Sequence, residues 1–314
     1  MKRRIKWGVF LFCLVLAACS KGESPKKTAT GESIQLPISV VTTTGMIGDL
    51  AVNIGGDRVH VKALMGAGVD PHLYKATASD ITKLDSADII FYNGLNLEGK
   101  MGDIFVRISR KNPNVIAVTE EVDHARILEP PAFQGHYDPH VWFDVELWQE
   151  AAKRVLKGLE EFDAAGAQSY RKNFEVYQLK LKELHQWSLK KSSELPKEKR
   201  ILVTSHDAYN YFGRAYGFQV VGLQGISTVT QAGLADIARM VDFIIQSKVK
   251  AIFIETSVSP KAIERVQADA KGRGWDVKIG GELFSDAMGA AETPEGTYVG
   301  MLKHNMSTIT EHLK

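Results

Sequence analysis

Cysteine is nearly absent from this chain of 314 residues, which has only two, Cys13 and Cys19. Both lie close to the N-terminus, so the rest of the chain has no thiol. This excludes a disulfide-stabilised fold and any metal site built on thiolates. A metal site in the body of this chain has to use histidine, aspartate or glutamate.

The sequence also lacks a surplus of charge of either sign. Lysine and arginine number 39, aspartate and glutamate number 37, and the formal net charge is +2. Nucleic-acid-binding domains normally carry a strongly basic face, so we expect no nucleic acid among the partners. The hydrophobic content of 44% is that of an ordinary globular protein, and the length allows one large or two medium domains.

The apolar run near the N-terminus, Trp7–Ala18, is shorter than the roughly 20 residues that an ordinary transmembrane helix needs. Lysines and arginines precede it, which is the layout of a secretory signal. The run ends in "LAAC", which resembles the lipobox of bacterial lipoproteins, in which the cysteine becomes the lipidated first residue. A plain signal peptide that happens to end near a cysteine is the alternative.

We therefore predict a lipoprotein signal peptide at residues 1–18 and a lipid on Cys19. The polar residues 19–35 cannot form a core and are predicted to be a flexible tether. The protein would then lie outside the cytoplasm, in the periplasm or at the cell surface, held to a bacterial membrane by the lipid on Cys19.

Strand and helix patterns alternate in the first half of the body. β-branched and apolar runs at 38–44, 59–65, 87–94 and 114–119 are typical of strands, and residues 76–86 of a short helix. Such alternation favours an α/β unit with a parallel sheet. We predict an N-terminal lobe at residues 36–165, which includes a helical pattern from 141 to about 162.

A long helical pattern follows, from about 167 to 195, and Pro196 ends it. Its apolar positions are spaced four, three, four and three residues apart, as on one face of a helix. They are Tyr170, Phe174, Tyr177, Leu181 and Leu184. At 1.5 Å per residue this helix would be about 40 Å long, so we predict a rigid linker helix at residues 166–196.

Alternation then resumes, which predicts a C-terminal lobe at residues 197–314. The predicted strands are 200–205, 218–223, 250–255 and 276–279, the last followed by a Gly-Gly turn, and the predicted helices are 208–216, 232–247, 260–270 and 293–313. The expected fold class is α/β, with two lobes, each a parallel β-sheet with flanking helices, joined by one long rigid linker helix.

Three of the nine histidines are placed where ligands bind in α/β folds. His72 lies in the loop after a strand, His140 in the loop before a helix, and His206 directly after the strand "LVTS". Asp286, after another predicted strand, adds a carboxylate. Three imidazoles and one carboxylate suit Zn²⁺, Mn²⁺ or Fe²⁺. Imidazoles must be neutral to coordinate, so binding should weaken below about pH 6.

Other polar residues are weaker candidates. His136 could be a further ligand on the loop that carries His140, although four ligands already suffice. Glu255 ends a strand at the same edge and could orient a ligand, as could Asp207 beside His206. Four other histidines are better explained as surface or packing residues; they are His60, His185, His304 and His312. Trp142 and Trp148 are read as packing residues.

Five segments together resemble the metal-binding solute-binding lipoproteins of bacterial ABC importers (family 9, cluster A-I). They are "GAGVDPHLYKATASDITKLDSADIIFYNGLNLEGKM", "DPHVWFD", "LVTSHDAYNYFGRAYGF", "IFIETSVSP" and "ELFSDAMG". The resemblance covers nearly all of residues 36–314. It implies two α/β lobes linked by one long helix, with the metal between them, and it carries the ligand role over to His72, His140, His206 and Asp286.

The resemblance also bears on the choice of metal. Manganese-specific members often have glutamate where His206 stands, and zinc-specific members often carry a long His-rich loop that is missing between His72 and His140. The chain is thus similar to the subgroup with three histidines and one aspartate, for which manganese and zinc are both known.

From this resemblance we expect a receptor that binds Mn²⁺ or Zn²⁺, with Fe²⁺ as a further candidate. The receptor would deliver its ion to an ABC permease with its ATPase subunit. We expect a monomer and no enzymatic activity. A secreted metal-dependent hydrolase is one alternative, but the sequence has no H-E-x-x-H pair. A surface adhesin is another, and no residue pattern supports a separate adhesive site.

Overall fold

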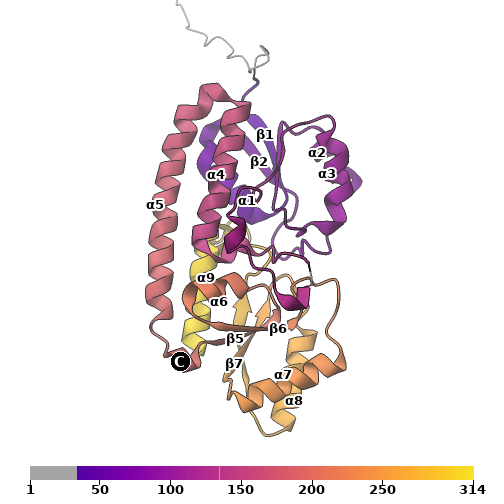
Figure 1. Ribbon diagram of the computed structural model, residues 1–314, viewed down its shortest axis with the longest axis vertical. Helices are drawn as coiled ribbons and strands as arrows, with labels where there is room; N and C mark the ends of the chain where they lie inside the picture. Colours follow the sequence, from indigo (N-terminus) through magenta and orange to yellow (C-terminus); the bar gives the residue numbers. More distant parts are fainter. Residues whose placement is uncertain (1–33, 134) are drawn as a thin grey trace, which may run out of the picture.

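The computed structural model describes residues 34–133 and 135–314 and has two lobes, one above the other in Figure 1. The predicted signal peptide, Cys19 and most of the predicted tether lie outside the described residues. Among the helices that are described, none combines the length and the apolar character needed to cross a bilayer.

The N-terminal lobe is built on a parallel sheet with the strand order β2-β1-β3-β4. Its strands are β1 Ile38–Thr42, β2 Val59–Ala63, β3 Ile89–Tyr92 and β4 Val115–Ala117. Its helices are α1 Gly45–Gly55, α2 Ala78–Asp85, α3 Gly102–Ser109 and α4 Val145–Phe162. Helices α2 and α3 cover one face of the sheet, and α1 and α4 cover the other (Figure 1).

Coverage of both faces explains the unbroken apolar runs in these strands. Phe91 and Ile89 of β3 belong to the core beneath α1 and α4, whereas Ile90 between them belongs to the core beneath α2 and α3. Alternate side chains of a strand point to opposite faces. In a strand that is buried on both faces, both sets of side chains are therefore apolar.

The C-terminal lobe contains two parallel strand pairs, β5–β6 and β7–β8. Its strands are β5 Ile201–His206, β6 Gln219–Gln224, β7 Ala251–Glu255 and β8 Lys278–Leu283. Its helices are α6 Asn210–Tyr216, α7 Leu234–Gln246, α8 Lys261–Gly272 and α9 Tyr298–His312. The α/β class, the parallel strands and the flanking helices agree with the sequence-based prediction.

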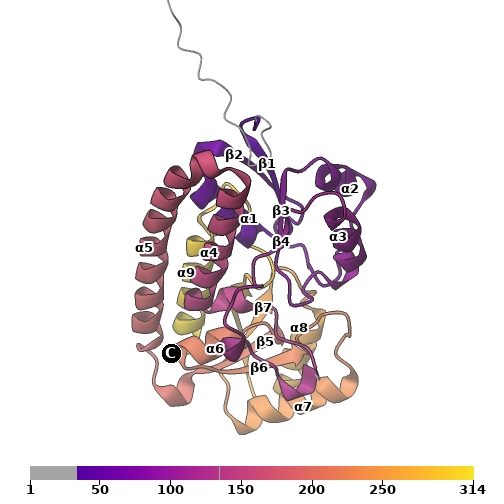
Figure 2. The ribbon, with the colours of Figure 1, turned by 45° about the horizontal axis from the view of Figure 1, so that its top comes forward.

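The long helix α5, Ala167–Ser192, runs along the side of both lobes (Figures 1 and 2). It packs against α1 and α4 of the first lobe and against α9 of the second. Tyr170, Tyr177, Leu181 and Leu184 of the predicted stripe are buried, and Phe174 is partly buried against the same core. The helix ends at Ser192, three residues before the predicted end at Leu195, where the following Pro196 disfavours helical geometry.

Two features differ from the sequence-based expectation. Helices α1 and α3 have no counterpart among the predicted elements. The expected turn at Gly280 and Gly281 is wrong, because both residues lie inside β8. A Cβ atom at Gly280 would lie 2.7 Å from the ring of Phe253, and Gly281 has a φ of +135°. The glycine pair therefore permits a close approach of β8 to β7 and does not mark a chain reversal.

The packing of α5 can be tested with two leucines of that helix. Leu181 is fully buried, whereas Leu179 is 60% exposed. Leu181→Ala should lower the free energy of unfolding by about 2–5 kcal/mol, because it leaves a cavity in the core. Leu179→Ala should change it by no more than about 0.5 kcal/mol. Urea denaturation of the metal-free protein measures both, and equal effects would contradict the packing described for α5.

Candidate metal centre

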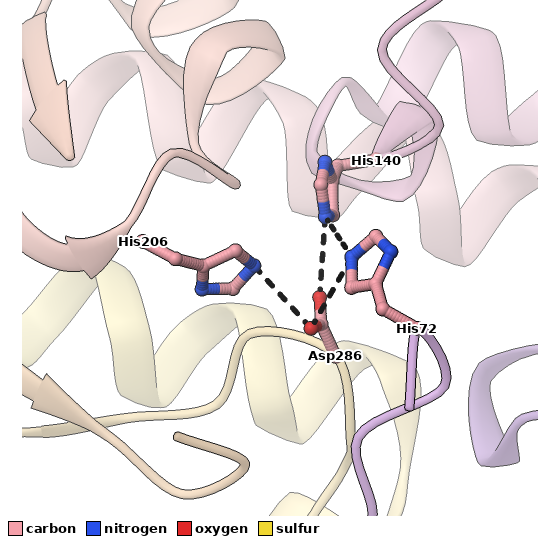
Figure 3. Close-up of side chains that lie close together, drawn as sticks. All are labelled: His72, His140, His206 and Asp286. Carbon is pink, nitrogen blue, oxygen red and sulfur yellow. Dashed lines mark hydrogen bonds and ion pairs between the residues drawn. The ribbon is translucent and has the colours of Figure 1, made fainter. Parts of the chain in front are cut away.

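Four side chains that are far apart in the sequence meet between the two lobes. His72, His140, His206 and Asp286 each offer a potential ligand atom, and these atoms all lie within 4.8 Å of one another. In Figure 3 the three imidazoles surround the carboxylate of Asp286. His72 and His140 come from the N-terminal lobe, and His206 and Asp286 from the C-terminal lobe.

Four of the distances within this group are close to those expected around one metal ion. Nε2 of His72 lies 3.3 Å from Nε2 of His140. The oxygens of Asp286 lie 3.3 Å from Nε2 of His140, 3.3 Å from Nε2 of His206 and 3.7 Å from Nε2 of His72. Four ligands placed tetrahedrally at about 2.0–2.1 Å from an ion would be about 3.4 Å from one another.

Burial makes this arrangement costly unless something binds to it. The four residues are at most 4% exposed. Among the described residues, Nε2 of His206 and both carboxylate oxygens of Asp286 have no hydrogen-bond partner outside this group of four side chains. Unsatisfied buried polar atoms are rare in native proteins because each costs about 1–3 kcal/mol. A divalent cation would satisfy all three atoms at once.

Two carboxylates fix the orientation of two of the imidazoles. Oδ1 of Asp138 lies 2.7 Å from Nδ1 of His140, and Oε2 of Glu255 lies 2.5 Å from Nδ1 of His206. Each carboxylate also accepts the backbone N–H of the same histidine, at 3.0 and 2.8 Å. When such an imidazole is neutral, its proton stays at Nδ1 and the lone pair of Nε2 points at the centre of the site.

Glu255 thus contacts a predicted ligand directly, as expected for an orienting residue. Asp207 does not: none of its hydrogen bonds within the described part of the chain reaches the four side chains. It lines a cavity of about 340 Å³ next to β6, and burial raises the pKa of its carboxyl against the effect of Asn210. His136 is also outside the group, and its ring packs at 5.3 Å from that of Phe133.

The loop before His140 is held by residues that the sequence analysis did not single out. The side-chain amide of Asn93 donates to the carbonyl of Pro139 at 3.1 Å. Buried Glu98 accepts the backbone N–H of Asn93 at 2.8 Å and the hydroxyl of Thr43 at 2.6 Å. The signal was present in "YNGLNLEG", where polar residues directly follow the buried strand β3.

His72 has a similar support in Asp70. One oxygen of Asp70 accepts the backbone N–H of His72 at 2.8 Å, a local contact of the kind aspartate commonly makes two residues on. The other oxygen accepts the hydroxyl of Thr228, in the C-terminal lobe, at 2.6 Å. The sequence "DPH" indicates the local contact between Asp70 and the backbone of His72, but no sequence pattern indicates the contact between Asp70 and Thr228 across the lobes.

Burial and charge set the protonation of the four side chains. Burial, aided by the other two histidines and opposed by Asp286, lowers the pKa of His72 to about 3. Burial also opposes protonation of His140, but Asp138 and Asp286 outweigh it and raise its pKa to about 9. In the same way Glu255 and Asp286 overcome burial and raise the pKa of His206 well above its usual value.

The pKa of the Asp286 carboxyl shifts in the opposite direction, downward. Burial would raise its pKa, but His206 and His140 hold it well below the usual range. In the metal-free site these shifts favour an ion pair between the carboxylate of Asp286 and the imidazoles of His140 and His206, and a metal ion has to displace the protons that these imidazoles carry.

Known proteins resemble the chain over almost its whole length. The family model described as "Zinc-uptake complex component A periplasmic" matches residues 40–312. The manganese-binding lipoprotein MntA of Bacillus subtilis is 45% identical over 287 residues, which cover 91% of this chain and 93% of MntA. The zinc-binding protein TroA of Treponema pallidum is 48% identical over 274 residues, which cover 87% of this chain and 88% of TroA.

The fold is similar to a solved structure as well. The structure of the periplasmic zinc-binding protein TroA from Treponema pallidum superimposes with a TM-score of 0.86 and 47% sequence identity. The match covers 88% of this chain and 99% of that one. At this level of identity the likeness extends beyond a shared fold to a shared family.

The raised pKa values of His140 and His206 predict proton release on metal binding. At pH 7 about two protons should leave for each ion bound, because both imidazoles must be neutral to coordinate. Affinity should therefore keep rising between pH 6 and about 9, beyond the range expected for a free imidazole. Calorimetric titration in buffers of different ionisation enthalpy counts these protons, and a count near zero at pH 7 would contradict the assigned protonation.

Proposed function

We infer that this chain, which belongs to the family of periplasmic zinc-uptake complex components A, binds one divalent transition-metal ion outside the cytoplasm and delivers it to an ABC permease. The observation that carries the proposal is the buried group of three imidazoles and one carboxylate, with atoms at its centre that have no partner outside the group among the described residues. In this family the binding protein works with a permease and its ATPase subunit, and we expect both as partners. We expect the binding protein itself to be a monomer.

We propose His72, His140, His206 and Asp286 as the ligands of the ion. Asp138 and Glu255 orient two of the imidazoles, and Asp70 and Asn93 steady the loops that bear His72 and His140. Four protein ligands complete a tetrahedral shell, whereas a hydrolytic metal centre keeps a position open for water. This difference favours a binding protein over an enzyme.

The ion is Mn²⁺ or Zn²⁺, with Fe²⁺ as a further candidate. Two relatives of similar identity are named for different metals, manganese at 45% and zinc at 48%. Imidazole and carboxylate ligands bind Zn²⁺ more tightly than Mn²⁺, so a purified protein can take up zinc whichever ion it carries in the cell. Elemental analysis of the protein extracted from its native membrane distinguishes the physiological ion.

We further propose the division of the chain made from the sequence. Residues 1–18 are the signal peptide, 19–35 the tether after lipidated Cys19, 36–165 and 197–314 the two lobes, and 166–196 the linker helix. The name of MntA, like the names of most of the similar relatives, includes the word lipoprotein, which supports the lipid. The lipid would hold the protein to a bacterial membrane in the periplasm or at the cell surface.

The ligand assignment predicts a clear separation between variants. Loss of an orienting partner alone typically costs about 10- to 100-fold in metal affinity, so His140→Ala and Asp286→Ala should each cost at least about 100-fold. His304→Ala is the control, because His304 lies on α9 and contacts the carbonyl of Glu282 at 3.0 Å. Competition with a zinc chelator measures affinity, and circular dichroism verifies folding. Wild-type affinity in folded Asp286→Ala would contradict the assignment.

Lipidation of Cys19 is tested separately. Cys19→Ser should abolish incorporation of a labelled fatty acid and release the protein from the membrane fraction, because serine does not form the thioether. Cys13→Ser, within the predicted signal peptide, is the matched control and should leave labelling intact. Labelling that survives in Cys19→Ser would exclude the lipoprotein assignment without affecting the metal site.

A further inference from the structure

Trp142 lies between two of the proposed ligands and is almost fully buried, at 1% exposed. It follows His140 by two residues, and its ring meets that of His140 edge to face, with centroids 5.2 Å apart. Its indole N–H donates to the carbonyl of Ser285 at 3.0 Å. Ser285 directly precedes Asp286, so one side chain of the N-terminal lobe bonds to the segment that carries the carboxylate of the other lobe.

The other bonds to this segment come from its own lobe. The side chain of Asn305 bonds to both the N–H and the carbonyl of Phe284, at 2.9 and 2.7 Å. The hydroxyls of Ser257 and Ser285 are 3.0 Å apart. Within the part of the chain that the structure describes, the Trp142 indole makes the one hydrogen bond from the N-terminal lobe to the backbone of residues 284–286; His72 and His140 contact only the carboxylate of Asp286.

Residue 142 is tied to the C-terminal lobe at a second point. The hydroxyl of Tyr298, at the start of α9, donates to the backbone carbonyl of Trp142 at 2.7 Å. Tyr298 is fully buried. The backbone and the indole of Trp142 therefore both bond across the lobes, and the lobes cannot separate at the metal centre without breaking the bond from the indole to Ser285.

We propose that Trp142 is a positioning residue whose indole N–H holds Asp286 against the ligands of the N-terminal lobe and so slows release of the ion. The proposal rests on the function proposed above. It adds a positioning role to the packing role that the sequence predicts for Trp142, which lies in the core. Trp148 is the natural comparison, because it is equally buried in α4 but its indole N–H has no hydrogen-bond partner among the described residues.

The test compares Trp142→Phe with Trp148→Phe in the full-length, detergent-solubilised protein loaded with Zn²⁺. Both changes remove similar ring volume from the core, but only Trp142→Phe removes a hydrogen bond. An excess of a chromophoric zinc chelator traps the released ion, and stopped-flow absorbance gives the release rate. Trp142→Phe should release zinc about 3- to 10-fold faster than the wild type, the effect of one net hydrogen bond. Trp148→Phe should stay within about twofold.

The melting temperatures of the metal-free variants separate packing from positioning. Both variants should melt at lower temperature than the wild type, because both lose buried contacts. Equal release rates in the two variants would overturn the role of Trp142. A wild-type protein that takes up no zinc, manganese or iron would instead overturn the proposed function.

A second measurement uses the wild-type protein, so it tests the proposal even if the Trp142→Phe variant fails to fold. Nuclear magnetic resonance follows the exchange of the indole N–H protons with solvent. Each of the other tryptophan-to-phenylalanine variants loses one indole signal, and the signal that remains unassigned belongs to Trp142. Bound Zn²⁺ should slow exchange of the Trp142 indole proton at least about tenfold and leave that of Trp148 within about twofold. Unchanged exchange at Trp142 would contradict the proposal.

Discussion

Four buried polar side chains that meet between the two lobes are the constraint on which the rest of this molecule depends. Each lobe supplies two of them, and within the described residues one imidazole nitrogen and two carboxylate oxygens at their centre have no hydrogen-bond partner outside the group. Burial on this scale is unfavourable in an apolar interior. The two lobes and the helix α5 hold these groups together in spite of that cost, and a divalent cation removes it.

The surroundings of the four side chains explain how the cost is sustained. Asp138 and Glu255 each bond to the ring and the backbone of a histidine, so two of the proposed ligands, His140 and His206, are fixed in position. Asp70 and Trp142 bond across the lobes next to a ligand from each side. The site is therefore a property of the interface between the lobes, and binding and release of the ion depend on how firmly that interface is closed.

The strands and the long helix could be predicted because the spacing of their apolar residues reflects which side chains are buried. The meeting of His72, His140 and His206 could be predicted because they lie in loops and at strand ends, where ligands bind in α/β folds. Helix α1 was missed because its sequence, "GMIGDLAVNIG", contains three glycines and has low intrinsic helix propensity. Packing of Met46, Ile47, Leu50 and Ile54 in the core stabilises it, and no local pattern reports such contacts. The bonds of Asp70 to Thr228 and of Trp142 to Ser285 join residues more than a hundred positions apart, which a single sequence does not reveal.

The most direct test of this account is the anomalous scattering of crystals of the metal-loaded protein, recorded at the absorption edge of the ion. We expect one strong peak between the lobes, about 2.0–2.2 Å from Nε2 of His72, His140 and His206 and from the carboxylate of Asp286. A peak elsewhere in the molecule, or one bonded to side chains of a single lobe, would contradict the account.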